Sequence, residues 1–235
     1  MLNPLLRRVT AWGLLIAALS VTAYATRPSS TTPAQAAPTA EAMAAIVRAS
    51  AAAPATSADT VVFAGGCFWS MQKAFDHVDG VTETMAGYAG GTVADPSYEQ
   101  VETGRTGHAE SVRVIYDPTK LRYANLINAY VHRIDPTDGG GTFCDRGPQY
   151  RPVIFVRDST HRKIAEASLA ALGKVFEKPI AVQVMTSSAF YPAEEYHQEY
   201  YKKNPTQYDR YRVGCGRDEA LDAAWKGKSF PPLPN

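Results

Sequence analysis

The sequence has few cysteines, almost no excess charge and no closely paired metal-ligand motif. It contains three cysteines in 235 residues, too few for a disulfide-stabilised scaffold, and the odd number leaves at least one thiol unpaired within the chain. Lys and Arg number 24 against 23 Asp and Glu, without a long basic run, which disfavours a nucleic-acid partner. No C-x-x-C or H-x-x-x-H spacing occurs, so we expect no metal site. The 45% of apolar residues excludes a fully disordered chain.

Residues 1–25 have the organisation of a signal peptide. Two arginines precede an apolar stretch, and Ala-Tyr-Ala at residues 23–25 supplies a small-x-small cleavage site. The stretch from residue 9 to residue 25 is shorter than the roughly 20 apolar residues of a membrane-spanning helix, so cleavage is favoured over anchoring. We therefore expect an exported protein, in the periplasm, with no membrane attachment after cleavage.

Residues 26–58 consist largely of Ala, Pro, Ser and Thr. Such a segment buries little apolar surface and is typical of a flexible linker. The folded catalytic domain is predicted over residues 59–235. Strands are predicted at 60–64, 81–88, 109–116, 153–156 and 181–185, and helices at 68–77, 118–133, 159–176 and 193–202.

This alternation of strands and helices predicts an α+β fold. We expect a two-layer α/β sandwich with a mixed sheet and a ferredoxin-like core, followed by a long, coil-rich C-terminal tail. Neither a repeat nor a second hydrophobic core is visible in the sequence, so we expect one domain, acting as a monomer.

Cys67 lies in the most informative segment, Gly-Gly-Cys-Phe-Trp at residues 65–69. The glycines follow a predicted strand and permit a tight turn. The thiol then falls at the first turn of a helix, where unpaired N–H groups favour an anion. We therefore expect a pKa below the usual 8.5 or so and a reactive thiolate. The alternative is that Cys67 is a small buried apolar residue and that Phe68 and Trp69 belong to the core.

Several motifs of this sequence resemble those of one enzyme family. They are Gly-Cys-Phe-Trp at 66–69, Gly-Tyr-Ala-Gly-Gly at 87–91, Pro-Ser-Tyr at 96–98, Thr-Gly-His-Ala-Glu at 106–110, Asp-Arg-Gly-Pro-Gln-Tyr at 145–150, Tyr-His-Gln at 196–198 and Asn-Pro at 204–205. Together and in this order they resemble the peptide methionine sulfoxide reductases of the A type. The resemblance covers roughly residues 61–205, and Ser70, where the family usually has glycine, is a departure.

The resemblance implies thiol-dependent reduction of methionine S-sulfoxide, free or within oxidised proteins. It assigns Cys67 as the attacking thiolate, and Phe68 and Trp69 as the walls of a pocket for the substrate methyl group. Glu110 is implied as the proton donor to the sulfoxide oxygen, which requires a carboxyl whose pKa is raised by burial. Without the resemblance, Glu110 would be assigned to the solvated surface.

Three further polar side chains receive roles from the resemblance. Tyr98 and Tyr150 would add hydroxyl donors, and Asp145 would orient the substrate or a water molecule. From the residues alone, the tyrosines could be ordinary half-buried packing, and Asp145 could pair with Arg146. We leave His108 and His197 outside the catalytic set.

Attack on the sulfoxide would leave Cys67 as a sulfenic acid, which a second thiol condenses with to form a disulfide. Cys215 is favoured as this resolving thiol, because glycines flank it and because the family places such a cysteine near the C-terminus. Cys144, next to Asp145, remains a reserve thiol or a packing residue. The reaction requires no metal or organic cofactor, and a thioredoxin-like dithiol is the expected reductant.

Two other functions remain open. A Cys–His hydrolase or acyltransferase would also use a nucleophile on a strand-to-helix turn, but it requires a histidine held by a third polar group. An exported binding module would use a structural disulfide, either Cys144–Cys215 or Cys67–Cys215.

Overall fold

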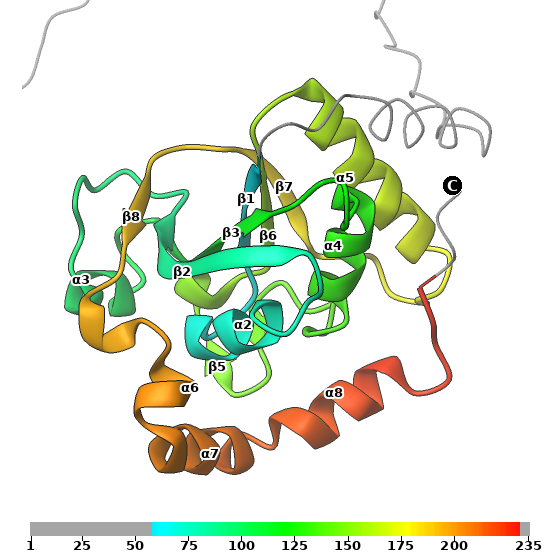
Figure 1. Cartoon of the computed structure of the whole chain (residues 1–235). Helices are drawn as coiled ribbons and strands as arrows, with labels where there is room; N and C mark the ends of the chain where they lie inside the picture. Colours follow the sequence, from blue (N-terminus) through cyan, green and yellow to red (C-terminus); the bar gives the residue numbers. More distant parts are fainter. Residues whose placement is uncertain (1–57, 231–235) are drawn as a thin grey trace, which may run out of the picture. The chain divides into compact units, whose positions relative to one another are not determined.

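The computed structural model describes residues 58–230 (Figure 1). The predicted signal peptide, and the predicted linker as far as residue 57, lie outside the described residues. None of the helices within 58–230 is long and apolar enough to cross a membrane.

Within the described residues, six strands form one mixed sheet. Their order is β7-β6-β1-β3-β2-β8, and all neighbours are antiparallel except β6 and β7. The strands are β1 (Asp59–Ala64), β2 (Val81–Ala89), β3 (Ala109–Tyr116), β6 (Val153–Val156), β7 (Gln183–Thr186) and β8 (Phe190–Pro192). The four central strands are connected as a split β-α-β arrangement of the ferredoxin type. The predicted mixed sheet and α+β class are confirmed.

Alternation along the strands separates two apolar layers. In β1, Val61 and Phe63 join the large core, whereas Val62 and Ala64 join a smaller cluster with Phe155. The large core is closed by α2 (Phe68–Phe75), α4 (Tyr123–Val131) and α5 (Ser159–Leu172), which all contribute buried side chains to it. These helices therefore cover one face of the sheet, as expected for a two-layer sandwich.

Short elements complete the loops. They are α3 (Tyr98–Glu102), the small hairpin of β4 (Gly141–Thr142) and β5 (Asp145–Arg146), η1 (Pro148–Tyr150), η2 (Glu195–His197) and α6 (Tyr200–Lys203). The start of α3 is fixed by a capping box, in which Ser97 accepts from the backbone N–H of Gln100 and the Gln100 side chain accepts from the backbone N–H of Ser97. The side chain of Asp158 caps α5 by accepting the backbone N–H of His161.

The chain after β8 differs from the prediction in two ways. The helix expected at 193–202 is wrong, because this stretch holds only the short η2 and the start of α6, and Glu199 between them adopts a left-handed conformation (φ 50°) that interrupts a helix. The coil-rich tail is also wrong for residues 205–225. These form α7 (Pro205–Gly214) and α8 (Arg217–Trp225), drawn in orange and red along the lower edge of Figure 1.

Both tail helices are anchored to the domain. The Tyr208 hydroxyl of α7 donates to the Ser70 hydroxyl of α2, and the Trp225 indole N–H of α8 donates to the backbone carbonyl of Ile134. The sequence does not indicate helix α7, because this helix has almost no apolar stripe and buries only Tyr208. The tail therefore packs as ordered structure next to α2.

Candidate active site

Cys67 occupies the turn between β1 and α2. Gly66 has a φ of +82°, and a Cβ atom at this residue would lie 2.6 Å from the Cβ of Thr142, so the turn requires glycine. Cys67 is the N-cap of α2 and not part of its first turn, and its carbonyl accepts the N–H groups of Ser70 and Met71. Its side chain is only 6% exposed.

The Glu110 carboxylate lies directly beside Cys67. It comes from the start of β3, it is 4% exposed, and its Oε2 accepts the backbone N–H of Phe68 at 2.9 Å. Burial raises the pKa of Glu110 to about 8, with the negative charge of Asp145 acting in the same direction and the Phe68 hydrogen bond opposing it. The expectation that this carboxyl is buried and has a raised pKa is confirmed.

The expected lowering of the Cys67 pKa is wrong in this structure. Burial raises the pKa of the thiol strongly, and the negative charges of Glu110 and Asp145 raise it further. A hydrogen bond with Tyr211 and the positive charge of Arg217 lower the pKa of the thiol, but by less. The sequence argument failed because the free N–H of Phe68 at the start of α2 is directed at Glu110 and so does not stabilise a thiolate.

Phe68 and Trp69 follow the thiol in sequence and pack against other rings. Phe68 is 1% exposed, with Tyr98 stacked at a ring-centroid distance of 6.5 Å. Trp69 stacks on Tyr200 at 3.8 Å, and its indole N–H donates to Nδ1 of His197 at 3.0 Å. His197 thus fixes the orientation of Trp69.

Tyr98 and Tyr150 approach the same site from α3 and η1. Burial raises the pKa of both phenols, and the charge of Glu110 is the next contribution for each. Both hydroxyls therefore stay protonated at neutral pH and can donate hydrogen bonds. The backbone N–H of Tyr98 donates to Glu194, which also accepts the Tyr88 hydroxyl and so ties α3 to β2.

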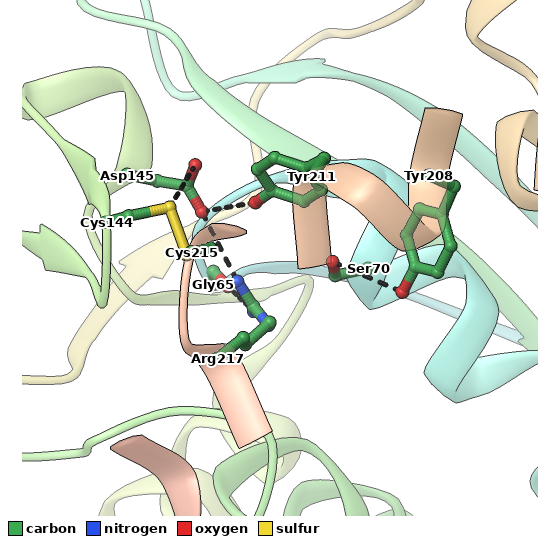
Figure 2. The surroundings of a disulfide bond; sticks show 8 residues. All are labelled: Gly65, Ser70, Cys144, Asp145, Tyr208, Tyr211, Cys215 and Arg217. Atoms are coloured by element: carbon green, nitrogen blue, oxygen red, sulfur yellow. Dashed lines mark hydrogen bonds and ion pairs between the residues drawn. A yellow bond between two sulfur atoms is a disulfide. The ribbon is translucent and has the colours of Figure 1, made fainter. Parts of the chain in front are cut away.

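Asp145 is held by the tail and not by its neighbour in sequence. Its Oδ2 accepts the Tyr211 hydroxyl at 2.7 Å and pairs with Arg217 at 3.3 Å, in an ion pair whose side chains are 10% and 3% exposed. Arg146 pairs with Asp138 instead. Figure 2 shows Tyr211 and Arg217 converging on Asp145 from α7 and α8.

The three cysteines are divided between a disulfide and a free thiol. Cys144 and Cys215 are joined, and Cys67 is the free thiol (Figure 2). Cys215, which we favoured as the partner of Cys67, is thus bonded in this structure to the reserve cysteine. The two sulfur atoms and a carboxylate oxygen of Asp145 lie within 4.8 Å of one another. As a disulfide the sulfurs offer no thiolate to a metal.

The comparisons with known proteins agree with this geometry. The family model for peptide methionine sulfoxide reductase matches residues 59–229. The chain is 47% identical over 173 residues to a peptide methionine sulfoxide reductase MsrA of Bacillus pumilus, covering 73% of this chain and 97% of that protein. An MsrA of Ligilactobacillus salivarius is 49% identical over 171 residues, covering 72% and 99%. The chain belongs to the peptide methionine sulfoxide reductase family.

Solved structures support the same assignment of this reductase. Methionine sulfoxide reductase A of Corynebacterium diphtheriae has a TM-score of 0.58 and 32% identity, over 66% of this chain and 78% of that one. Reduced Mxr1 from Saccharomyces cerevisiae has a TM-score of 0.59 and 29% identity, over 63% and 87%. The reductase is thus an oxidoreductase for methionine S-sulfoxide. Neither the hydrolase nor the binding module is favoured.

Three residues of this reductase's site were not predicted from the sequence. Tyr211 and Arg217, in the tail helices, bind the Asp145 carboxylate and lower the pKa of Cys67. The His197 ring accepts the indole N–H of Trp69. The Tyr-His-Gln motif at 196–198 was a signal for His197, which we interpreted as structural. Nothing in the sequence alone indicated Tyr211 or Arg217, because both depend on how α7 and α8 fold back.

Proposed function

We propose that the protein reduces methionine S-sulfoxide, free or peptide-bound, through attack of the Cys67 sulfur on the sulfoxide sulfur. The observation that carries this mechanism is the position of Glu110, buried beside Cys67 and hydrogen-bonded to Phe68 N–H. With a pKa of about 8, most Glu110 carries a proton at neutral pH. It can therefore donate that proton to the sulfoxide oxygen as the S–O bond breaks.

The aromatic side chains support recognition of the substrate methyl group. Phe68 and Trp69 directly follow Cys67 in sequence, and an apolar methyl group is favoured against such rings. The hydrogen bond from Trp69 to His197 fixes one of these walls. We assign the methyl pocket to Phe68 and Trp69, with His197 as a positioning residue.

Hydrogen bonds to the polar part of the sulfoxide would come from Tyr98 and Tyr150. Both phenols remain protonated near Glu110 and Cys67, so they can stabilise the oxygen as its charge changes. Asp145 would orient the substrate or a water molecule. This role is compatible with its fixed contacts to Tyr211 and Arg217.

The electrons for the reaction would come from thiols alone. The Cys67 thiol and the sulfoxide give methionine and Cys67 sulfenic acid, with no net uptake of protons, and a second thiol then forms a disulfide and water. We propose Cys215 as that thiol and a thioredoxin-like dithiol as the external reductant. No metal or organic cofactor takes part in this scheme.

We also propose that the protein acts after export, as a monomer in the periplasm. This rests on the signal-peptide pattern of residues 1–25 and the polar linker that follows. The dithiol reductant would then belong to the same compartment. Cell fractionation with an antibody to the folded domain tests this proposal, and recovery in the cytosol with an intact N-terminus would contradict it.

The experiment for the reaction itself compares the two epimers of a methionine sulfoxide peptide with dithiothreitol as reductant. The wild type should reduce the S-epimer only, Cys67→Ser should be inactive, and Glu110→Gln should be slower by about 10²–10⁴-fold. Activity of Cys67→Ser, or equal rates with both epimers, would contradict the proposal.

A further inference from the structure

A cavity of about 230 Å³ lies where α2, α7 and α8 meet the segment after α4. Neither Cys67 nor the aromatic residues assigned to the methyl pocket line it. Among the described residues, no Asp or Glu lines it either. Its lining is instead rich in positive charge, from Lys73, Arg133, Arg212 and Arg217.

Nearby carboxylates neutralise only part of this charge. The two arginines of the tail helices are already paired, one with Asp218 and the other with Asp145. In the part of the chain that the structure describes, neither Lys73 nor Arg133 forms an ion pair with a carboxylate. Two uncompensated positive charges therefore border the same cavity, and both would attract an anion placed in it.

Aromatic rings hold the Lys73 ammonium group in position. It lies 4.7 Å from the ring centroid of Tyr208 and 5.8 Å from that of Tyr201. A cation–π contact attracts the charge but gives the N–H groups no oxygen to bond. The ammonium group has no oxygen acceptor among residues 58–230, so its donors remain available to a ligand.

Ser70 adds a neutral donor to the same lining. It is 4% exposed, and Figure 2 shows the Tyr208 hydroxyl directed at it. That hydroxyl in turn accepts an N–H of Arg212 at 3.2 Å. This series of donors ends at the Ser70 O–H, for which the described residues provide no acceptor. Ser70 is also the position at which this chain departs from the usual glycine of the family, and a buried hydroxyl proton there favours a ligand that accepts it.

This set of donors is suited to a phosphate group. The ligand must accept hydrogen bonds from several directions, because the donors belong to α2, to the segment after α4 and to the tail helices. A tetrahedral phosphate meets that requirement better than a planar carboxylate, and Arg and Lys are its usual partners. The cavity has room for several water molecules, and Ala74 and Leu221 give it an apolar side. A small organic group can therefore lie beside the phosphate.

Arg217 connects this cavity with Cys67. Its side chain lines the cavity, pairs with Asp145 at 3.3 Å and donates to the Gly65 carbonyl at 3.5 Å. Its positive charge lowers the pKa of the Cys67 thiol. A phosphate dianion beside Arg217 would offset that charge. A smaller fraction of Cys67 would then be thiolate, and the thiol would react more slowly.

We propose that this cavity binds a phosphate group, free or carried by a small molecule, and that its occupation slows the reactions of Cys67 through Arg217. Lys73 and Arg133 bind the anion, and Ser70 donates to one of its oxygens. The inference does not rest on the proposed function, because alkylation of Cys67 reports the effect without turnover. The competing explanation is a solvated basic surface that attracts all anions alike.

Calorimetric titration of the full chain with inorganic phosphate and with phenyl phosphate tests the site, at an ionic strength held constant with potassium chloride. We expect saturable binding to the wild type, about tenfold weaker binding to Lys73→Gln and to Arg133→Gln, and about threefold weaker binding to Ser70→Ala, which removes no charge. Lys163→Gln removes an exposed charge of α5 outside the cavity and is the matched control, so it should bind as the wild type does. Tighter binding of phenyl phosphate identifies a phosphate ester as the ligand, and equal binding identifies free phosphate.

Alkylation by iodoacetamide tests the connection to Cys67, which is the one free thiol while Cys144 and Cys215 remain joined. Saturating phenyl phosphate should slow wild-type alkylation on the order of threefold, with the half-saturating concentration found by calorimetry. The same concentration should leave the rate of Lys73→Gln nearly unchanged, and a wild-type unfolding midpoint for that variant excludes misfolding.

The outcomes separate the site from its effect. Absence of saturable binding, affinity that is unchanged in Lys73→Gln and Ser70→Ala, or an equal loss of affinity in Lys163→Gln would overturn the site. Saturable binding that leaves the alkylation rate of the wild type unchanged would overturn the connection through Arg217. Neither result bears on whether the protein reduces methionine sulfoxide, which the peptide assay measures separately.

Discussion

Replacing Glu110 by glutamine should stabilise the protein, and the gain should grow with pH. The pKa of Glu110 is about 8, against 4.5 for an ordinary glutamate. Since one pKa unit corresponds to about 1.4 kcal/mol, ionising this carboxyl in the folded state costs roughly 5 kcal/mol. Glutamine is nearly the same size and its carbonyl can still accept the Phe68 N–H. The variant therefore removes the ionisable group and changes little else at the site.

The sign of the pH dependence follows from proton binding. Between pH 4.5 and 8 the unfolded chain has lost the Glu110 proton while the folded protein keeps it, so this group makes the wild type less stable as pH rises, by about 1.4 kcal/mol per pH unit. The stability that the raised pKa of Glu110 contributes is fully present below pH 4.5 and is lost as the pH rises through 8. From pH 5 to pH 8, the stability of Glu110→Gln relative to wild type should increase by roughly 3.5 kcal/mol, because the slope is smaller near each of the two pKa values.

Urea unfolding at pH 5, 6, 7 and 8, with the disulfide kept intact, measures this difference. Glu166→Gln is the control, because its carboxylate belongs to an exposed helix pair with Arg162, 55% exposed on the glutamate side. Its stability relative to wild type should change little over the same range. If the difference between Glu110→Gln and wild type does not change with pH, the carboxyl does not hold its proton in the folded protein and the reasoning is refuted.

Three further predictions concern the chemistry of the site. The kcat/KM of the wild type should fall above a pH of about 8, where Glu110 loses its proton, and a pH–rate profile of Glu110→Gln should lack this limb. Asp145→Asn should make Cys67 react faster with iodoacetamide at pH 8, because a charge that raises the pKa of the thiol is removed; slower alkylation would contradict this. His197→Ala removes the acceptor of the Trp69 indole N–H, so it should lower kcat/KM and shift the tryptophan emission, and unchanged values of both would exclude the positioning role.

Most of the sheet and its helices could be predicted from sequence, because their signals are local. In β1 the apolar run from Val61 to Ala64 is buried on both faces, and the glycines after it mark the turn. The Gly-Cys-Phe-Trp segment likewise identified Cys67 from neighbouring residues. Such features depend on a few consecutive side chains, which the sequence displays directly.

The parts that could not be predicted depend on distant contacts. The raised pKa of Cys67 results from burial and from Glu110 and Asp145, which lie 43 and 78 residues away in sequence. The helices α7 and α8 are stabilised by contacts to α2 and to Ile134 in the segment after α4, because their own apolar patterns are weak. The pairing of Cys144 with Cys215 cannot be derived from spacing alone.

The central claim is that Cys67 attacks the sulfoxide sulfur and takes up its oxygen. The most direct measurement uses a Cys144→Ser, Cys215→Ser double variant, in which no second thiol can consume the sulfenic acid. After incubation with methionine S-sulfoxide, dimedone labelling and mass spectrometry should find one adduct, on Cys67, for each methionine formed, and no adduct with the R-epimer. Methionine formation without an adduct on Cys67, or labelling that does not depend on the epimer, would contradict the account.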